Sequence, residues 1–131
     1  MFLKTQMTTH NILIMILVCT WASVMMVNAF NGDGTFYGDG GHGAEGACML
    51  ERGFNGIPMT VAINHEQWMG GAVCGRCVLI QPTLNGIGMT PIAEALKATI
   101  DNLCPECNYG DIDIGLDGDG RWKILWEFVE C

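Results

Sequence analysis

Basic residues are scarce in this chain of 131 amino acids, which has 6 lysines and arginines against 14 aspartates and glutamates. The formal net charge is −8 at neutral pH. Nucleic acids and anionic membranes are recognised mainly through lysine and arginine, so the composition argues against both as partners. An acidic surface remains compatible with a neutral polymer, such as cellulose or another glucan, or with a basic protein.

Several motifs of metal and modification sites are also missing. The segment His65-Glu66-Gln67-Trp68-Met69 lacks the second histidine of a zinc-protease helix. Asp117-Gly118-Asp119-Gly120 does not fit the twelve-residue calcium loop, and we interpret it as a turn. No Asn-x-Ser/Thr sequon occurs, so N-glycosylation is not expected. The sequence predicts no metal site and no cofactor.

Residues 1–29 have the features of a secretory signal peptide. Lys4 is their only charged side chain, an apolar run spans residues 12–18, and Val27-Asn28-Ala29 fits a cleavage signal of small residues. A membrane anchor is the competing interpretation, but polar residues interrupt the apolar run and no basic stop-transfer cluster follows. We expect a secreted, extracellular protein whose mature chain, residues 30–131, forms one small domain.

The cysteines agree with secretion. Cys19 leaves with the signal peptide, and six of the seven cysteines remain. An even number in a small secreted chain is typical of a disulfide framework, so we expect three disulfides. Two pairs have CxxC spacing, at 74–77 and 104–107, which would also allow a zinc site. Secretion favours oxidation, but six cysteines allow fifteen pairings and the spacing does not choose among them.

Short strands separated by glycine-rich turns predict a small β-barrel. Residues 32–46 are expected to be loop, apart from a short strand at 35–37. We expect a short helix near 91–96, because Thr90 and Pro91 form a helix-start signal. Apolar runs and alternation predict further strands at 59–63, 77–80, 98–101, 112–114 and 122–129.

Asp113 lies in the middle of the short strand Ile112-Asp113-Ile114, just after the second CxxC loop. A carboxylate in such a strand is fixed in direction and partly desolvated by its neighbours. Sites that cleave or grip polysaccharides use carboxylates of this kind. The alternative interpretation is a solvated aspartate at the edge of a strand.

The order of several motifs resembles the first domain of expansins. These motifs are Gly34-Thr35-Phe36-Tyr37-Gly38, Gly46-Ala47-Cys48, Cys74-Gly75-Arg76-Cys77, Cys104-Pro105, Asp111-Ile112-Asp113-Ile114 and Trp126-Glu127-Phe128-Val129-Glu130-Cys131. The chain is also similar to single-domain expansin-like proteins (loosenins and RlpA-like proteins), to barwin and to plant natriuretic peptides. The resemblance covers nearly the whole mature chain. It implies an all-β fold, a six-stranded double-psi β-barrel with at most one or two short helices.

The resemblance also implies a site and a disulfide pattern. Asp113 matches the essential acid of expansins and of the related family-45 glycoside hydrolases. Thr35 and Tyr37 match residues that line the same groove, and Asn102 matches the polar residue before the Cys-Pro step. The implied disulfides are Cys48–Cys74, Cys77–Cys131 and Cys104–Cys107.

Two departures from expansins bear on the chemistry. The family's His-Phe-Asp is Asp111-Ile112-Asp113 here, so a second carboxylate replaces the histidine. Residues two apart in a strand share a face, so Asp111 would help Asp113 act as a proton donor if both pointed into the groove. We expect instead that Asp111 is solvated. We expect no counterpart of the aromatic second domain of expansins, so sugar stacking would fall to Trp68 or Trp122, whereas Trp126 is expected in the core.

Three functions fit these residues. An inverting hydrolase needs an acid and a base about 6.5–9.5 Å apart. Asp39 occupies the base position of the family-45 enzymes, but its glycine-rich loop is too flexible to hold a base. A protein-binding defence, effector or inhibitor module of the barwin or natriuretic-peptide kind is another possibility. We favour a secreted monomer that binds cell-wall polysaccharide and loosens it without hydrolysis.

Overall fold

A computed structural model of the chain describes residues 28–38, 43–89 and 92–131. All but the last two residues of the expected signal peptide lie outside these ranges, and so does Asp39. Within the described ranges, no helix is long and apolar enough to cross a membrane.

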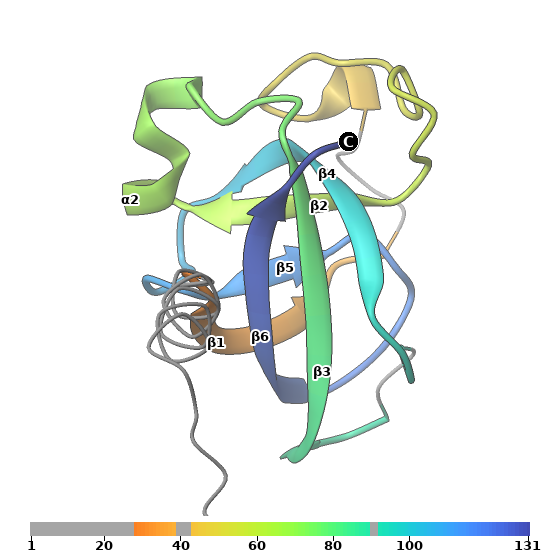
Figure 1. Cartoon of the computed structure of the whole chain (residues 1–131), viewed down its shortest axis with the longest axis vertical. Coiled ribbons are helices and arrows are strands. Elements are labelled where there is room, and N and C mark those ends of the chain that lie inside the picture. Colours follow the sequence, from red (N-terminus) through yellow and green to blue (C-terminus); the bar gives the residue numbers. More distant parts are fainter. Residues whose placement is uncertain (1–27, 39–42, 90–91) are drawn as a thin grey trace, which may run out of the picture.

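Six strands close into a barrel (Figure 1) in the order β1-β5-β2-β4-β3-β6. The pairs β1–β5 and β2–β4 are parallel, and the other neighbours are antiparallel. The predicted all-β fold, a six-stranded double-psi β-barrel, is confirmed. The strands are β1 (Phe30–Phe36), β2 (Thr60–Asn64), β3 (Cys77–Ile87), β4 (Leu96–Cys104), β5 (Ile112–Ile114) and β6 (Arg121–Val129).

The helices are short: α2 (His65–Trp68) and the 3-10 turns η1 (Gly43–Glu45) and η2 (Met69–Gly71). Asn64 starts α2, because its side-chain oxygen accepts a hydrogen bond from the Gln67 N–H at 3.0 Å.

The helix expected near 91–96 is wrong for the described part of that range. Residues 92–95 form no helix, and β4 begins at Leu96, opposite Ile80 of β3. The apolar residues of this segment fit both a helical period and the alternation of a strand. The strand forms because β4 is hydrogen-bonded to β3 on one side and to β2 on the other. Ile92 is buried although it does not belong to a helix.

The glycine-rich start of the domain is also more regular than expected, since β1 runs through Gly32 and Gly34. A side chain at Gly32 would place its Cβ 2.1 Å from the Gly110 carbonyl oxygen. Glycine at this position therefore allows two chain segments to lie close together, and it does not mark a loop.

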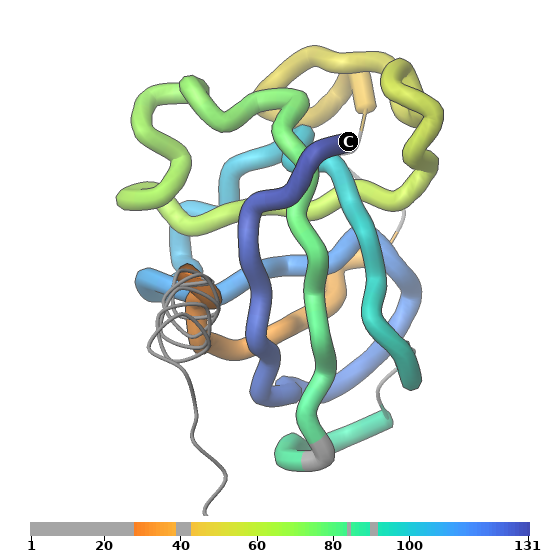
Figure 2. Tube along the Cα trace, in the orientation of Figure 1, coloured from red at the N-terminus to blue at the C-terminus, as the bar shows by residue number. Residues whose placement is uncertain are grey.

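The core fills the inside of the barrel. In the barrel wall, the two long strands β3 and β6 lie side by side (Figure 2). Three disulfides join Cys48 to Cys74, Cys77 to Cys131 and Cys104 to Cys107, the pairs that the resemblance implies. The largest fully buried side chains of the core are Val61, Ile63, Val73, Val78, Ile80, Ile100, Ile112, Ile114, Ile124 and Trp126.

Candidate functional site

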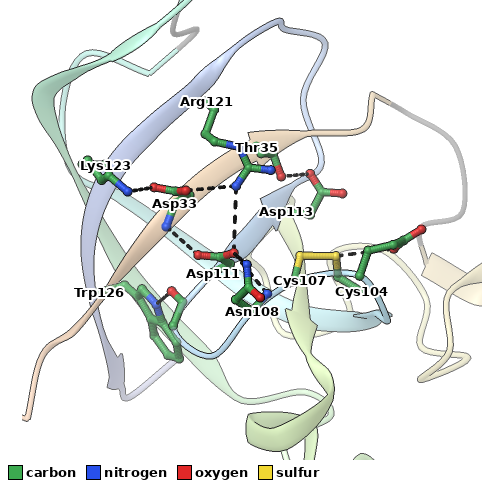
Figure 3. Close-up of polar contacts among 12 residues, drawn as sticks. Asp33, Thr35, Cys104, Cys107, Asn108, Asp111, Asp113, Arg121, Lys123 and Trp126 are labelled. Carbon is green, nitrogen blue, oxygen red and sulfur yellow. Dashed lines mark hydrogen bonds and ion pairs between the residues drawn. A yellow bond between two sulfur atoms is a disulfide. The ribbon is translucent and has the colours of Figure 1, made fainter.

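Asp113 is positioned by the shortest strand of the barrel. β5 has only three residues and lies between β1 and β2, with Asp113 opposite Thr35 on one side and Ala62 on the other. Ile112 and Ile114 are fully buried, so the alternation of the strand turns Asp113 to the other face. There the Thr35 hydroxyl donates a hydrogen bond to Asp113 Oδ1 at 2.7 Å (Figure 3).

An open cavity of about 300 Å³ lies over this pair. It brings together side chains from β1, β5, β6, the end of β4 and the loop between β4 and β5. The lining residues are Thr35, Cys104, Glu106, Cys107, Asp111, Asp113 and Arg121. The cavity therefore combines carboxylate acceptors, a hydroxyl and a guanidinium donor.

Asp111 is not solvated, contrary to expectation. It is 8% exposed, and its Oδ1 accepts a hydrogen bond from the Asp33 N–H at 2.8 Å. Its Oδ2 accepts from the Asn108 N–H at 3.1 Å and lies 3.9 Å from Arg121 Nη1. The backbone turn from Asn108 to Asp111 folds over the carboxylate, so protein donors replace water around it.

Asp33 extends this cluster along β1. Its carboxylate pairs with Arg121 Nη1 at 3.0 Å and also with Lys123 (Figure 3). The hydrogen bond from Lys123 is the main cause that lowers the pKa of Asp33, partial burial opposes it, and Arg121 adds to the lowering. Arg121 thus bridges Asp33 and Asp111 at the rim of the cavity.

Tyr37 and Asn102 lie beside each other, outside the set of residues that lines the cavity. The Tyr37 hydroxyl has side-chain hydrogen bonds to Asn102 and Thr60. Burial, and then the carboxylates of Asp101 and Asp113, raise the pKa of Tyr37, which keeps its hydroxyl protonated. Asn102 Oδ1 also accepts from the Ala47 N–H at 2.8 Å, so it holds a neighbouring loop in place.

The tryptophans expected to stack on sugar rings are placed differently from one another. Trp68 is 9% exposed and belongs to the core, so its prediction as a stacking surface is wrong: α2 turns the ring inward. Trp122 is half-buried, and its ring covers Gly86, where an added Cβ would come within 2.5 Å of Trp122 Cδ2. Trp126 is in the core, as expected, and donates to the Gly110 carbonyl at 2.7 Å.

Sequence reasoning missed three polar members of the site, Asp33, Glu106 and Arg121. Asp33 had a detectable signal, since it stands two residues before Thr35 and therefore faces the same side of the strand. Arg121 had none, because only barrel closure brings β6 beside β1. Within the ranges that the structure describes, no group of three or more histidine, cysteine or acidic side chains is arranged to hold a metal ion.

Neither a family model nor a curated protein matches the sequence. Among solved structures, an expansin of Clavibacter michiganensis, as an aspartate-to-asparagine mutant in complex with cellohexaose, has a TM-score of 0.61 at 18% identity. The match covers 78% of this chain and 50% of the expansin. The apo-expansin of the same organism gives a TM-score of 0.60 at 19% identity, with the same coverage.

A Streptomyces papain inhibitor is also similar, with a TM-score of 0.49, 20% identity and coverage of 79% of this chain and 96% of the inhibitor. The chain spans about half the length of the expansins it matches, at an identity that speaks for the fold alone. The protein therefore has the double-psi β-barrel fold found in the expansin structures.

Proposed function

We propose that this protein is a secreted expansin-like protein that binds cell-wall polysaccharide, cellulose or another β-glucan, and loosens it without hydrolysis. The observation that carries the proposal is the hydrogen-bonded pair of Thr35 and Asp113 in an open cavity of the barrel. The fold match to an expansin whose structure contains cellohexaose supports the choice of ligand. The three disulfides support secretion, because disulfides persist in oxidising compartments.

Asp113 would act on glucan chains through hydrogen bonds. A carboxylate accepts hydrogen bonds from sugar hydroxyls, and such charge-assisted bonds are about twice as strong as neutral ones. Thr35 fixes the direction of the carboxylate through its own hydrogen bond. Each hydroxyl that Asp113 captures is lost to the neighbouring glucan chain, so chain-to-chain contacts weaken while no glycosidic bond breaks.

The rest of the cavity suits a hydroxyl-rich, uncharged polymer. Arg121 offers donors, whereas Glu106 and Asp113 offer acceptors, and sugar hydroxyls satisfy both kinds of group. An anionic polymer would meet more carboxylates than cations in this cavity.

Binding to insoluble amorphous cellulose and to mixed-linkage glucan tests the proposal. The oxidised protein is compared with Asp113→Asn and with Glu130→Gln, which removes the same charge from an exposed position beyond β6 that does not line the cavity. We expect Asp113→Asn to weaken binding at least about tenfold, since a hydrogen bond to a charged group contributes roughly 1.5–3 kcal/mol. Glu130→Gln should bind as the unmodified protein does.

Two results would contradict the proposal. Unchanged binding and wall loosening by Asp113→Asn would remove Asp113 from the centre of the site. Reducing ends released from either glucan, and lost in Asp113→Asn, would instead make the protein a hydrolase.

A further inference from the structure

Tyr109 is an aromatic side chain with 56% exposure, and it lies in the chain between two cavity-lining residues, Cys107 and Asp111. It belongs to the loop between β4 and β5, whose residues Glu106 and Cys107 line the cavity together with Cys104 at the end of β4. Asp111, two residues after Tyr109, lines the cavity too. The Tyr109 ring is thus an exposed aromatic group on a loop whose neighbouring residues line the proposed glucan site.

The backbone around Tyr109 is a tight turn held from both sides. The Asp111 N–H donates to the Asn108 carbonyl at 3.0 Å, and the Asn108 N–H donates to Asp111 Oδ2 at 3.1 Å. Gly110 has a φ of 88°, the left-handed value that a type II turn requires after Tyr109. The Gly110 carbonyl also accepts from Trp126 Nε1 at 2.7 Å, which ties the turn to the core.

The ring of Tyr109 is supported by other aromatic residues. Its centroid lies 6.1 Å from that of Phe30, with the two rings at 79° to each other. Phe30 packs in turn on Trp126, at a centroid distance of 4.4 Å. An edge-to-face contact leaves much of the ring open to solvent, in agreement with its exposure. The ring is therefore held in advance, which lowers the entropy lost when a ligand packs on it.

We propose that Tyr109 is a stacking platform for a sugar ring of a β-glucan chain that also occupies the Asp113 cavity. This inference rests on the proposed function, and it adds a second point of contact. The apolar C–H face of a pyranose ring packs on an aromatic face, while the cavity takes hydroxyl groups. Asp111 joins the two points, because its carboxylate caps the Tyr109 turn and lines the cavity.

Two contact points make binding dependent on chain length. A short oligosaccharide occupies the cavity alone, whereas a longer one reaches from the cavity to the platform. Tyr109 should therefore matter more for cellohexaose than for cellobiose.

Titrations of the oxidised protein with cellohexaose and with cellobiose, followed by NMR, test this proposal. The variants are Tyr109→Ala, Tyr109→Phe and, as a matched control, Phe54→Ala. Phe54 is 51% exposed, and neither it nor its neighbours in the chain line the cavity. We expect Tyr109→Ala to weaken cellohexaose binding about tenfold, equivalent to ~1.4 kcal/mol. Tyr109→Phe and Phe54→Ala should bind nearly as the unmodified protein does, and cellobiose binding should change little in any of them.

A direct readout covers the case in which Tyr109→Ala fails to fold. Nuclear Overhauser effects between the Tyr109 ring protons of the unmodified protein and sugar C–H protons are expected, and their absence in the saturated complex would overturn the platform. Equal losses in Tyr109→Ala and Tyr109→Phe would overturn stacking as its cause.

The outcomes separate this inference from the proposed function. If Tyr109→Ala binds cellohexaose normally while Asp113→Asn does not, the platform is wrong and the cavity stands. If the unmodified protein binds neither cellohexaose nor insoluble glucan, the proposed function is wrong, and the platform is wrong with it.

Discussion

Asp111 and Asp113 are the same amino acid, two residues apart on one short stretch of chain, and they have different roles. Asp111 is buried and accepts hydrogen bonds from two backbone N–H groups, with Arg121 close by. Asp113 is half-buried, accepts a hydroxyl hydrogen bond from Thr35 and faces the cavity. Their surroundings separate a carboxylate that holds backbone segments together from one that faces an open cavity.

The largest effect that this difference predicts is on stability. Asp111→Ala removes the acceptor of the Asp33 and Asn108 N–H groups and leaves Arg121 with one carboxylate fewer. Donors left unsatisfied in a buried place cost about 1–3 kcal/mol each, so we expect a loss of roughly 2–4 kcal/mol in the free energy of unfolding. Denaturant unfolding with the disulfides intact measures it.

Asp113→Asn is the control in the same experiment. It keeps the size of the side chain and its ability to accept from Thr35, so its stability should stay within about 1 kcal/mol of the unmodified protein. The contrast between the two carboxylates fails if Asp113→Asn is the more destabilised of the two variants.

A smaller effect concerns pH and the cluster around Asp111. The pKa of Asp33 is lowered, chiefly by the Lys123 hydrogen bond, so the folded state binds this proton less readily than the unfolded chain does. The stability that Asp33 contributes is present above its unfolded pKa of about 3.9 and is lost as the pH falls through the lower folded value. Relative to Asp33→Asn, the unmodified protein should lose up to about 1 kcal/mol more between pH 5 and pH 2, as measured by denaturant unfolding across that range. Parallel pH profiles for the two proteins would show that the ion pairs contribute nothing.

The smallest expected stability effect is at the partner of Asp113. Thr35→Val removes the hydroxyl that donates to Asp113 Oδ1 and keeps the shape of the side chain. Water in the open cavity can replace that donor, so the stability loss should be about 0.5 kcal/mol. Glucan affinity should fall about threefold, because Asp113 is no longer fixed in direction. If Thr35→Val loses glucan affinity but keeps its free energy of unfolding, the contrast between Asp113 and Asp111 is sharpened. If it loses stability but keeps its affinity, the contrast is contradicted.

Much of the fold was predictable because the period of the apolar residues is strong where a strand faces the core. The segment around Ile124 and Trp126 and the segment around Asp113 both alternate, and both are strands. The region around Leu96 was ambiguous, since its residues also fit a helical period, and only the neighbouring strands settle it. Gly32 was assigned to a loop because the need for close contact with Gly110 is not visible in the chain.

The site was predictable only where its residues belong to one strand or follow from the family resemblance. Thr35 and Asp113 are paired across strands at the same register, and both line the cavity. The burial of Asp111 depends on the turn at 108–111. The burial of Trp68 depends on the short helix α2, which sequence reasoning missed although its first residue follows the N-cap residue Asn64. Arg121 reaches the cavity because the last strand of the barrel lies beside the first, a long-range event with no local signal.

The parallel pairing of β1 with β5 also has a kinetic consequence. Thr35 and Asp113 are partners in the ladder although 78 residues separate them, and β1 is held on its other side by β6. Contacts between such distant residues form late, because the entropy of closing a long loop must be overcome first. The cavity is therefore incomplete in a folding chain until β6, which supplies Arg121, has docked on β1.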